Sequence, residues 1–274
     1  MWVLAVTGPS DAGKTTLVER LAGRLDGPVA TVKHLDHAPD IDTEGKDTDR
    51  HRRAGAAATY GLADGEWFAT GDDRDIGGLL DDLAPDYEYA ILEGFSGARV
   101  PSVALGGRES AGETLLAAPD ADAVDPAAVV DALHDTEPHE TLESLVRRAK
   151  SAPDADRAGA IATFTGRVRA KDAPDDPRTE YLEFEKYEGV ADRRLAELRD
   201  DLLDGDGVYE VLLHHRTGIV EDGEDIVFVV VLAGHREEAF RTVEDGIDRL
   251  KEEVPLFKKE VTVEGEFWRH ERPQ

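Results

Sequence analysis

The 274-residue sequence contains no cysteine, so it can form no disulfide bond, bind no metal through thiolates and use no cysteine nucleophile. It also lacks long apolar runs. The longest, from Ile226 to Ala233, is far shorter than the roughly 20 residues that cross a bilayer. The chain opens on apolar residues without a basic region or a cleavable signal, which predicts a soluble, cytoplasmic protein.

Positive charge is also scarce. The 32 Lys and Arg residues stand against 60 Asp and Glu residues, for a net charge of −28. Such a surface repels nucleic acids and anionic membranes, so neither is an expected partner. The acidic residues are interpreted as a solvated surface and not as a binding site. The chain has only nine lysines, and six lie in the motifs described below: Lys14, Lys33, Lys46, Lys251, Lys258 and Lys259.

The first half of the sequence alternates strand patterns with helical patterns. Strands are predicted over 2–7, 28–33, 66–69, 89–92 and 102–105, and helices over 14–25, 51–60 and 76–83. Strands and helices in alternation require crossover connections, which favour parallel pairing. The first half is therefore predicted to be an α/β domain with a mainly parallel sheet.

A stretch rich in Asp, Ala and Pro, from 119 to 139, separates the two halves and contains a short predicted helix over 126–133. It predicts a boundary near Thr136, with domains over 1–136 and 137–274. Beyond it, strands are predicted over 160–168, 179–187, 207–215, 225–233 and 259–266, and helices over 140–149, 190–203 and 237–253. Strands that follow one another as neighbours or hairpins predict an α+β domain.

Residues 8–15, GPSDAGKT, match the phosphate-binding pattern GxxxxGK[ST] between a predicted strand and a predicted helix. Glycines let the backbone N–H groups curl toward phosphate oxygens, and the helix N-terminus adds positive partial charge. Lys14 would reach the β- and γ-phosphates, and the Thr15 hydroxyl would complete a Mg²⁺ shell. Glu93, at the end of an apolar strand, is a candidate to polarise the metal or its water, although many strands end in an acidic residue.

Further residues behind this loop are Lys33-His34, Asp42, Gly45-Lys46-Asp47, His51-Arg52, Gly55-Ala56 and Glu93-Gly94-Phe95. Over residues 1 to 134, the combination resembles the MobB family, the GTP-binding proteins of molybdopterin guanine dinucleotide biosynthesis. The resemblance implies GTP and Mg²⁺ as cofactors, slow hydrolysis, and an accessory role beside a separate guanylyltransferase. The guanine signature NKxD is absent, so GTP over ATP rests on the resemblance alone.

The phosphate-loop motif and the strand that ends at Glu93 together give the expected residues of this site. The metal would be held by Thr15 and Glu93. The nucleotide would contact Gly8, Asp11, Ala12, Gly13, Lys14, Thr15 and Thr16.

In the second half, basic residues gather near strand ends. They lie in the segments FTGRVR (164–169), HHRTG (214–218), AGHR (233–236) and LKEEVPLFKKE (250–260). The planar fork of arginine suits phosphate, and lysine acts as a point charge or, with a lowered pKa, as a general acid or base. The alternative is that these cations pair with surface carboxylates, as exposed ion pairs commonly do.

In this order and spacing, the four segments resemble the MoaE family, the catalytic subunit of molybdopterin synthase, over about residues 138 to 274. The resemblance implies an α+β fold like that of the synthase large subunit, and conversion of cyclic pyranopterin monophosphate to molybdopterin without a cofactor. The sulfur would arrive as a thiocarboxylate on the C-terminal Gly-Gly of a small ubiquitin-like carrier protein. The absence of cysteine is consistent with imported sulfur.

By position, Lys251 and Lys258 match the two active-site lysines of the MoaE family. Lys251 lies on a predicted helix and Lys258 seven residues later, past a turn at Pro255, so both can face one pocket. Their implied roles are proton transfer and stabilisation of acyl and phosphate charge. Lys259 adjoins Lys258, and an alignment shift of one residue would exchange the two.

The same resemblance implies a pocket for the phosphate and the pterin of the substrate. Arg169, His235 and Arg236 match that pocket, and Arg272 matches a residue lent by the other subunit of a homodimer.

Together these features predict a bifunctional protein that transfers sulfur and binds GTP. Two other functions remain open. The chain could be a non-catalytic adaptor, with the first domain as a GTP-gated scaffold and the second without turnover. It could also be a small-molecule kinase, which would account for the phosphate loop but not for the motifs of the second half.

Overall fold

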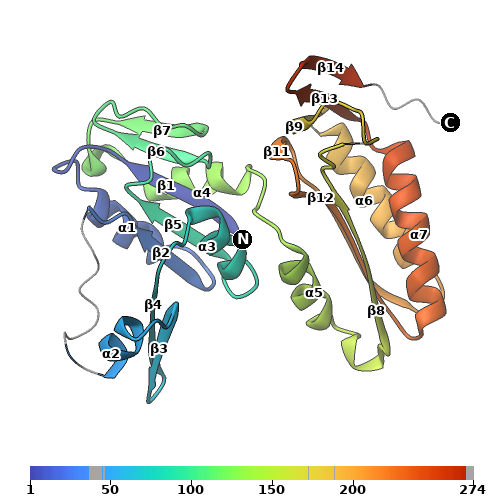
Figure 1. The fold of residues 1–274 in the computed structure, drawn as a ribbon, viewed down its shortest axis with the longest axis horizontal. Coiled ribbons are helices and arrows are strands. Elements are labelled where there is room, and N and C mark those ends of the chain that lie inside the picture. The colour runs from blue at the N-terminus through green and yellow to red at the C-terminus, as the bar shows by residue number, and fades with distance from the viewer. Residues whose placement is uncertain (37–44, 46, 172, 188, 270–274) are drawn as a thin grey trace. The chain divides into compact units, whose positions relative to one another are not determined.

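The fold is that of a computed structural model, which describes residues 1–36, 45, 47–171, 173–187 and 189–269. The chain forms two compact units, Met1–His139 and Glu140–Gln274 (Figure 1). The first is an α/β unit around a parallel sheet and the second is an α+β unit with antiparallel sheets, which confirms the predicted fold classes. In the described part of the chain, no helix combines the length and the apolar character needed to cross a membrane.

The boundary between the units lies after His139, slightly beyond the expected position at Thr136. The N–H of His139 donates to the carbonyl of Met1 at 2.8 Å, and the N-terminal ammonium donates to the carbonyl of His139 at 3.1 Å. The His139 ring also lies 2.8 Å from Asp81. These contacts attach the segment to the first unit, and composition alone could not reveal them because their partners are distant in sequence.

The core of the first unit is a five-stranded parallel sheet with strand order β2-β5-β1-β6-β7. Its strands are β1 (Trp2–Thr7), β2 (Val29–Lys33), β5 (Tyr89–Glu93), β6 (Ser102–Leu105) and β7 (Thr114–Ala118). The helices that pack on it are α1 (Lys14–Ala22), α3 (Ile76–Leu83) and α4 (Pro126–His134), with a 3₁₀ turn at Ala121–Ala123.

Alternate residues of β1 enter two different cores, because successive side chains of a strand point to opposite faces. Leu4 and Val6 pack with α1 and α4, whereas Val3 and Ala5 pack with α3. The sheet is thus covered on both faces, as parallel sheets generally are (Figure 1). This covering leaves the carboxyl ends of the strands as the edge where loops can build a site.

A separate antiparallel hairpin of β3 (Ala58–Ala63) and β4 (Glu66–Gly71) follows α2 (Asp47–Arg53). The helix predicted over 51–60 is therefore wrong in its second part. Gly55, with φ of 104°, lies just beyond the end of α2. The residues after it pair with β4, and this cross-strand pairing is invisible to a local periodicity. The strand β7 was also missing from the prediction.

The second unit contains two antiparallel sheets. The first has the order β10-β12-β8, with β8 (Ala160–Arg167), β10 (Val208–His215) and β12 (Asp225–Ala233). The second has the order β11-β9-β13-β14, with β9 (Thr179–Lys186), β11 (Gly218–Glu221), β13 (Leu256–Thr262) and β14 (Gly265–Arg269). The helices are α5 (Leu142–Lys150), α6 (Val190–Leu203) and α7 (Arg236–Glu253), with a 3₁₀ turn at Ala155–Arg157.

The three-stranded sheet lies between α5 on one face and α6 with α7 on the other (Figure 1). Val229 and Val231 of β12 enter the core beneath α6 and α7, and the intervening Val230 packs with α5. The single strand predicted over 259–266 is wrong, because the chain turns back between β13 and β14 to form a hairpin. The short strand β11 was not predicted.

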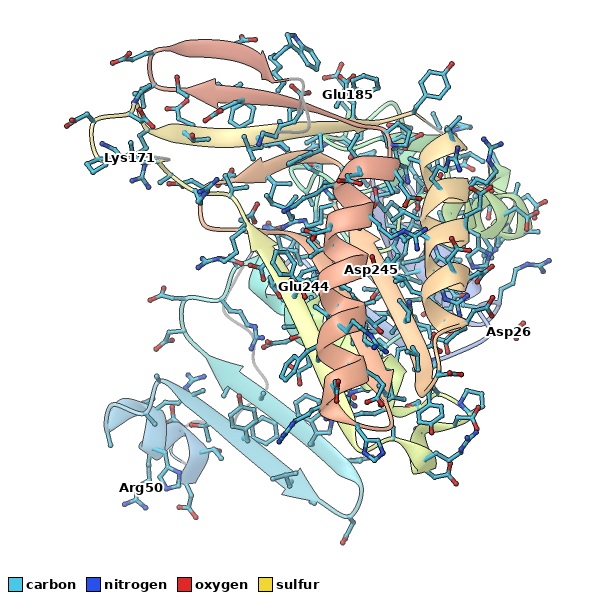
Figure 2. The ribbon with its side chains drawn as sticks, turned by 90° about the vertical axis from the view of Figure 1, so that its right-hand side faces the viewer. Asp26, Arg50, Lys171, Glu185, Glu244 and Asp245 are labelled. Carbon is cyan, nitrogen blue, oxygen red and sulfur yellow. The ribbon has the colours of Figure 1, made fainter. Side chains whose placement is uncertain are left out.

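Helix α7 carries an apolar face toward the sheet and an acidic face toward solvent. Glu244 and Asp245 lie on the outward face (Figure 2). Gly246 lets the helix approach the sheet closely, since a Cβ there would lie 3.2 Å from Cγ1 of Val229. The buried apolar side chains are Ala239, Val243, Ile247 and Leu250. This packing fixes the end of α7, where Val254 is the C-cap residue and Pro255 precedes β13.

Candidate functional sites

The phosphate loop joins β1 to α1 along a path that glycine makes possible. Gly13 has φ of 79°, a left-handed conformation that side chains disfavour, and a Cβ there would lie 2.8 Å from the Cβ of Ala121. The N–H of Ala121 donates to the carbonyl of Ala12 at 3.0 Å. The loop is therefore held against the 3₁₀ turn that precedes α4, and its backbone is preorganised.

The side chains of the loop meet the end of β5. The Lys14 ammonium folds over the loop and donates to the carbonyls of Gly8 and Pro9 at 2.9 and 2.7 Å. The Thr15 hydroxyl donates to Oε1 of Glu93 at 2.9 Å. Strands β1 and β5 are paired with Val6 opposite Glu93, and this register brings the carboxylate to the first turn of α1.

A second lysine shares this carboxylate. Nζ of Lys33, at the end of β2, lies 2.9 Å from Oε1 of Glu93, the atom that also accepts from Thr15. Glu93 itself is buried, and the register of β2 with β5 places Lys33 beside it. Hydroxyl and carboxylate oxygens are ligands that Mg²⁺ prefers, so Thr15 and Glu93 together fit a magnesium ion.

These groups line a cavity of about 840 Å³ at the carboxyl edge of the sheet. Four basic side chains belong to its wall, namely Lys14, Lys33, His34 and Arg108. Arg108 was not singled out from the sequence. Its position shortly after β6 could have indicated that it lines the site, because the carboxyl ends of parallel strands meet at one edge of the sheet. Such a cavity suits a polyphosphate.

The structure places the expected nucleotide contacts in and around this cavity. Gly8, Lys14 and Thr15 line it, together with Glu93. Among the described residues, the remaining expected contacts belong to the loop and the first turn of α1 without lining the cavity: Asp11, Ala12, Gly13 and Thr16. Asp42 and Lys46 lie outside the described residues.

The second unit holds a cavity of about 670 Å³ where the end of α7 meets both sheets. Its wall includes four basic side chains, which are Arg167, Arg169, Lys251 and Lys258. Aromatic rings and one imidazole complete much of the rest, namely Phe164, Phe184, Phe257 and His215. The cavity thus combines cations with flat apolar surface.

Both lysines expected in the active site line this cavity, together with Arg169. Lys251, in the last turn of α7, places its Nζ 5.9 Å from the ring centroid of Phe164. Lys258, on β13, is paired with Phe184 of β9. The short connection through Pro255 allows one lysine to approach from the helix and the other from the strand.

Lys259 is engaged elsewhere. Its Nζ lies 3.6 Å from Glu183 and 2.6 Å from Glu266, and it does not appear among the described residues of the cavity wall. The hydrogen bond to Glu266 is the main reason that the pKa of Lys259 is raised above its ordinary value. Successive side chains of β13 alternate, which places Lys259 and Lys258 on opposite faces.

His235 and Arg236 lie at the other end of α7 from Lys251. His235 is the N-cap residue and Arg236 the first helical residue. At 1.5 Å per residue, Arg236 lies about 22 Å along the helix axis from Lys251. Within the described part of one chain, His235 and Arg236 therefore do not join Arg169 in a single anion pocket. The sequence assigned these residues and Lys251 to one site, but the length of α7 separates them. Arg272 lies outside the described residues.

His215, the last residue of β10, is a member of the cavity wall to which the sequence assigned no role. Its Nδ1 lies 2.8 Å from the carbonyl oxygen of Arg216. A carbonyl only accepts, so Nδ1 carries the proton and Nε2 carries a lone pair. Burial lowers the pKa of His215 to about 4, although the hydrogen bond to Arg216 opposes this shift. The ring is therefore neutral at neutral pH.

This shift predicts a pH dependence of stability. Because the pKa in the folded chain is about 4 and that in an unfolded chain is about 6.5, only the unfolded state gains the proton between these values. The free energy of unfolding should fall as the pH drops through this window. On going from about pH 7.5 to pH 5, the wild type should lose on the order of 2 kcal/mol more than a His215→Phe variant. Urea denaturation at both pH values measures this, and identical losses in the two proteins would contradict it.

Comparison with known proteins places each unit in a family. Residues 3–131 match the family described as molybdopterin guanine dinucleotide synthesis protein B, MobB. Residues 135–253 match the family described as MoaE protein.

Similar proteins include one that matches the whole chain and others that match part of it. A Haloferax volcanii protein named probable molybdopterin synthase is 58% identical over 273 residues, which cover 99% of this chain and 100% of that protein. A molybdopterin synthase catalytic subunit of Pyrococcus abyssi is 39% identical over 110 residues, which cover 40% of this chain and 73% of that protein. The crystal structure of molybdopterin synthase from Staphylococcus aureus has 32% sequence identity and a TM-score of 0.43, and the match covers 49% of this chain and 93% of that one.

Proposed function

The chain belongs to the family of the Haloferax volcanii probable molybdopterin synthase and joins a MobB domain to a MoaE domain, and from this premise we propose how each unit works. The second unit, a molybdopterin synthase catalytic domain, transfers sulfur from a thiocarboxylated carrier protein to cyclic pyranopterin monophosphate. The observation that carries this proposal is the single cavity shared by Lys251, Lys258 and Arg169.

The charges of the cavity fit the two reactants. A thiocarboxylate and a phosphate are both anionic, and Lys251, Lys258 and Arg169 line the cavity of an otherwise strongly acidic chain. Lys251 and Lys258 transfer protons and stabilise the negative charge that develops on the acyl oxygen during transfer. Arg169 binds the phosphate, since a guanidinium matches phosphate oxygens with two parallel hydrogen bonds.

The proposed enzyme is a homodimer. His235 and Arg236 lie about 24 and 22 Å from Lys251 along the axis of α7, so they can serve this anion pocket only from a second copy of the chain. This arrangement retains the roles that the family resemblance implies for both residues.

For the first unit, we propose binding and slow hydrolysis of GTP with Mg²⁺, in support of guanine dinucleotide cofactor formation by a separate guanylyltransferase. The phosphate loop, Lys14 and the Thr15–Glu93 pair support it. On binding, Lys14 exchanges the carbonyls of Gly8 and Pro9 for the β- and γ-phosphates. Thr15 and Glu93 would hold the Mg²⁺ ion, which would supply positive charge to neutralise the phosphates. The choice of guanine rests on the MobB resemblance.

A second candidate is a non-catalytic adaptor, in which the first unit is a GTP-gated scaffold and the second has lost turnover. An adaptor has no need for two lysines and an arginine in one cavity, so the geometry favours the enzyme. The decisive experiment mixes the purified chain with thiocarboxylated carrier and cyclic pyranopterin monophosphate. Molybdopterin formation supports the enzyme, and binding of both reactants without product supports the adaptor.

The proposal makes a prediction about the carrier tail. A thiocarboxylated carrier should bind and yield product, whereas a carrier that lacks its last two residues should bind at least about tenfold more weakly, because it loses contacts in the cavity. The truncated carrier should give no product. Calorimetric titration and a product assay on both carriers measure these effects. Equal affinity for the two carriers, with product from neither, would exclude the thiocarboxylate mechanism.

A further inference from the structure

His215 lies in a row of residues that crosses the three-stranded sheet. The register pairs His215 of β10 with Val227 of β12, and Val227 with Gly166 of β8. All three residues line the cavity of the second unit. Val211 and Leu213 of β10 pack beneath α6 and α7, and alternation along the strand gives His215 this same face. The imidazole therefore projects toward the side from which Lys251 approaches.

The orientation of the imidazole is fixed from two sides. Nδ1 donates to the carbonyl of Arg216 at 2.8 Å, and the ring meets Phe184 edge to face, with centroids 4.8 Å apart and an interplanar angle of 73°. No described residue forms a hydrogen bond with Nε2. The ring is half-buried, and its remaining lone pair is available to a ligand in the cavity.

Side-chain hydrogen-bond acceptors are few among the described residues of this wall. Lysine and arginine side chains only donate, so Arg169, Lys251 and Lys258 can bind anionic groups but cannot receive an N–H. The guanidinium of Arg167 is engaged by the Gly223 carbonyl and by Asp225. Thr165 is paired with Phe228, whose side chain packs with α5, so strand alternation directs the Thr165 hydroxyl away from the cavity. Glu252 is exposed at the end of α7. His215 is the neutral, half-buried side-chain acceptor that remains among the described residues of the wall.

The surroundings of His215 suit a flat heterocycle. Phe184 packs against the imidazole. Phe164 lines the same cavity, and the Lys251 ammonium lies over its ring. A pterin presents an apolar ring face and N–H donors, whereas its phosphate requires cations. Aromatic rings, one neutral acceptor and basic residues line the same cavity, so it can bind both parts of such a molecule.

We propose that His215 positions the substrate of the sulfur-transfer reaction by accepting a hydrogen bond at Nε2 from an N–H group of the pterin ring. This inference rests on the proposed function of the second unit and adds to it a specificity-determining residue. The imidazole is neutral at neutral pH, because burial disfavours its protonated form and lowers its pKa to about 4. It holds the ring and transfers no proton.

Two variants separate the acceptor from the ring. His215→Phe keeps an aromatic ring and removes the acceptor, whereas His215→Gln restores an acceptor in its side-chain amide. With saturating thiocarboxylated carrier, His215→Phe should raise KM for the pterin substrate roughly 10- to 100-fold, the loss expected for one buried hydrogen bond, with kcat changed by less than about threefold. His215→Gln should recover most of the affinity. The shape of the pH profile of kcat should be the same in all three proteins.

An equilibrium measurement keeps this test separate from turnover. Titration of each protein with the pterin substrate alone, without carrier, should show the same loss in His215→Phe and the same recovery in His215→Gln. If the wild type binds the pterin but forms no product with carrier, the proposed sulfur transfer fails while this inference stands. An unchanged affinity in a folded His215→Phe would overturn the inference. So would a fall in kcat with loss of one limb of the pH profile, which indicates proton transfer, or unfolding of both variants, which indicates a purely structural role.

Discussion

Lys251→Ala and Lys258→Ala should each lower the rate of molybdopterin formation by roughly 10²- to 10⁴-fold while the fold survives. The Lys251 side chain is exposed at the end of α7, and Lys258 is half-buried on β13, so neither replacement opens a cavity in an apolar core. If a lysine only formed surface ion pairs, its loss would cost about 1 kcal/mol of stability or less and leave turnover unchanged. Initial rates and thermal melts of each variant distinguish the two roles.

Lys259→Ala is the matched control for this prediction. It removes a lysine from the same strand, but one that pairs with Glu183 and Glu266 on the opposite face from Lys258. Its turnover should be close to that of the wild type. Near-normal rates in both Lys251→Ala and Lys258→Ala would refute their catalytic assignment. A large loss in Lys259→Ala alone would show that the family alignment is shifted by one residue.

Lys14→Ala should weaken GTP binding by at least about 100-fold and leave sulfur transfer nearly intact. The lost ammonium would otherwise form charge-assisted hydrogen bonds with two phosphates, each worth more than a neutral hydrogen bond. Sulfur transfer should persist because Lys14 belongs to the unit Met1–His139 and the cationic cavity to the unit Glu140–Gln274. Calorimetric titration with Mg²⁺ and GTP, and a product assay on the same preparation, measure the two effects.

The control for Lys14→Ala is Lys150→Ala. Lys150 is exposed at the end of α5 and lies outside both cavities, so its removal should change neither nucleotide binding nor product formation. If a folded Lys14→Ala protein loses both activities while Lys150→Ala keeps both, the two units depend on each other. The modular function proposed for the chain would then be excluded.

The sequence by itself predicted features that depend on residues close together in the chain. The glycines, Lys14 and Thr15 form a continuous segment between a strand and a helix, so their spacing already describes the loop. Lys251 and Lys258 are seven residues apart across a proline, a distance short enough for both to reach one cavity. The alternation of strands and helices in the first half, and the run of strands in the second, likewise predicted both fold classes.

Tertiary structure decided the features that depend on distant partners. The register of β2, β5 and β1 brings Lys33, Glu93 and Thr15 together, although no local pattern relates them. Strand pairing also explains two wrong predictions. The end of the helix predicted over 51–60 belongs to the hairpin β3–β4, and the strand predicted over 259–266 is part of the hairpin β13–β14. The rise of α7 separated His235 from Lys251, whereas three paired strands brought His215 into the cavity that Lys251 lines. Local patterns record which face of an element is apolar, but only packing and register determine which elements those faces meet.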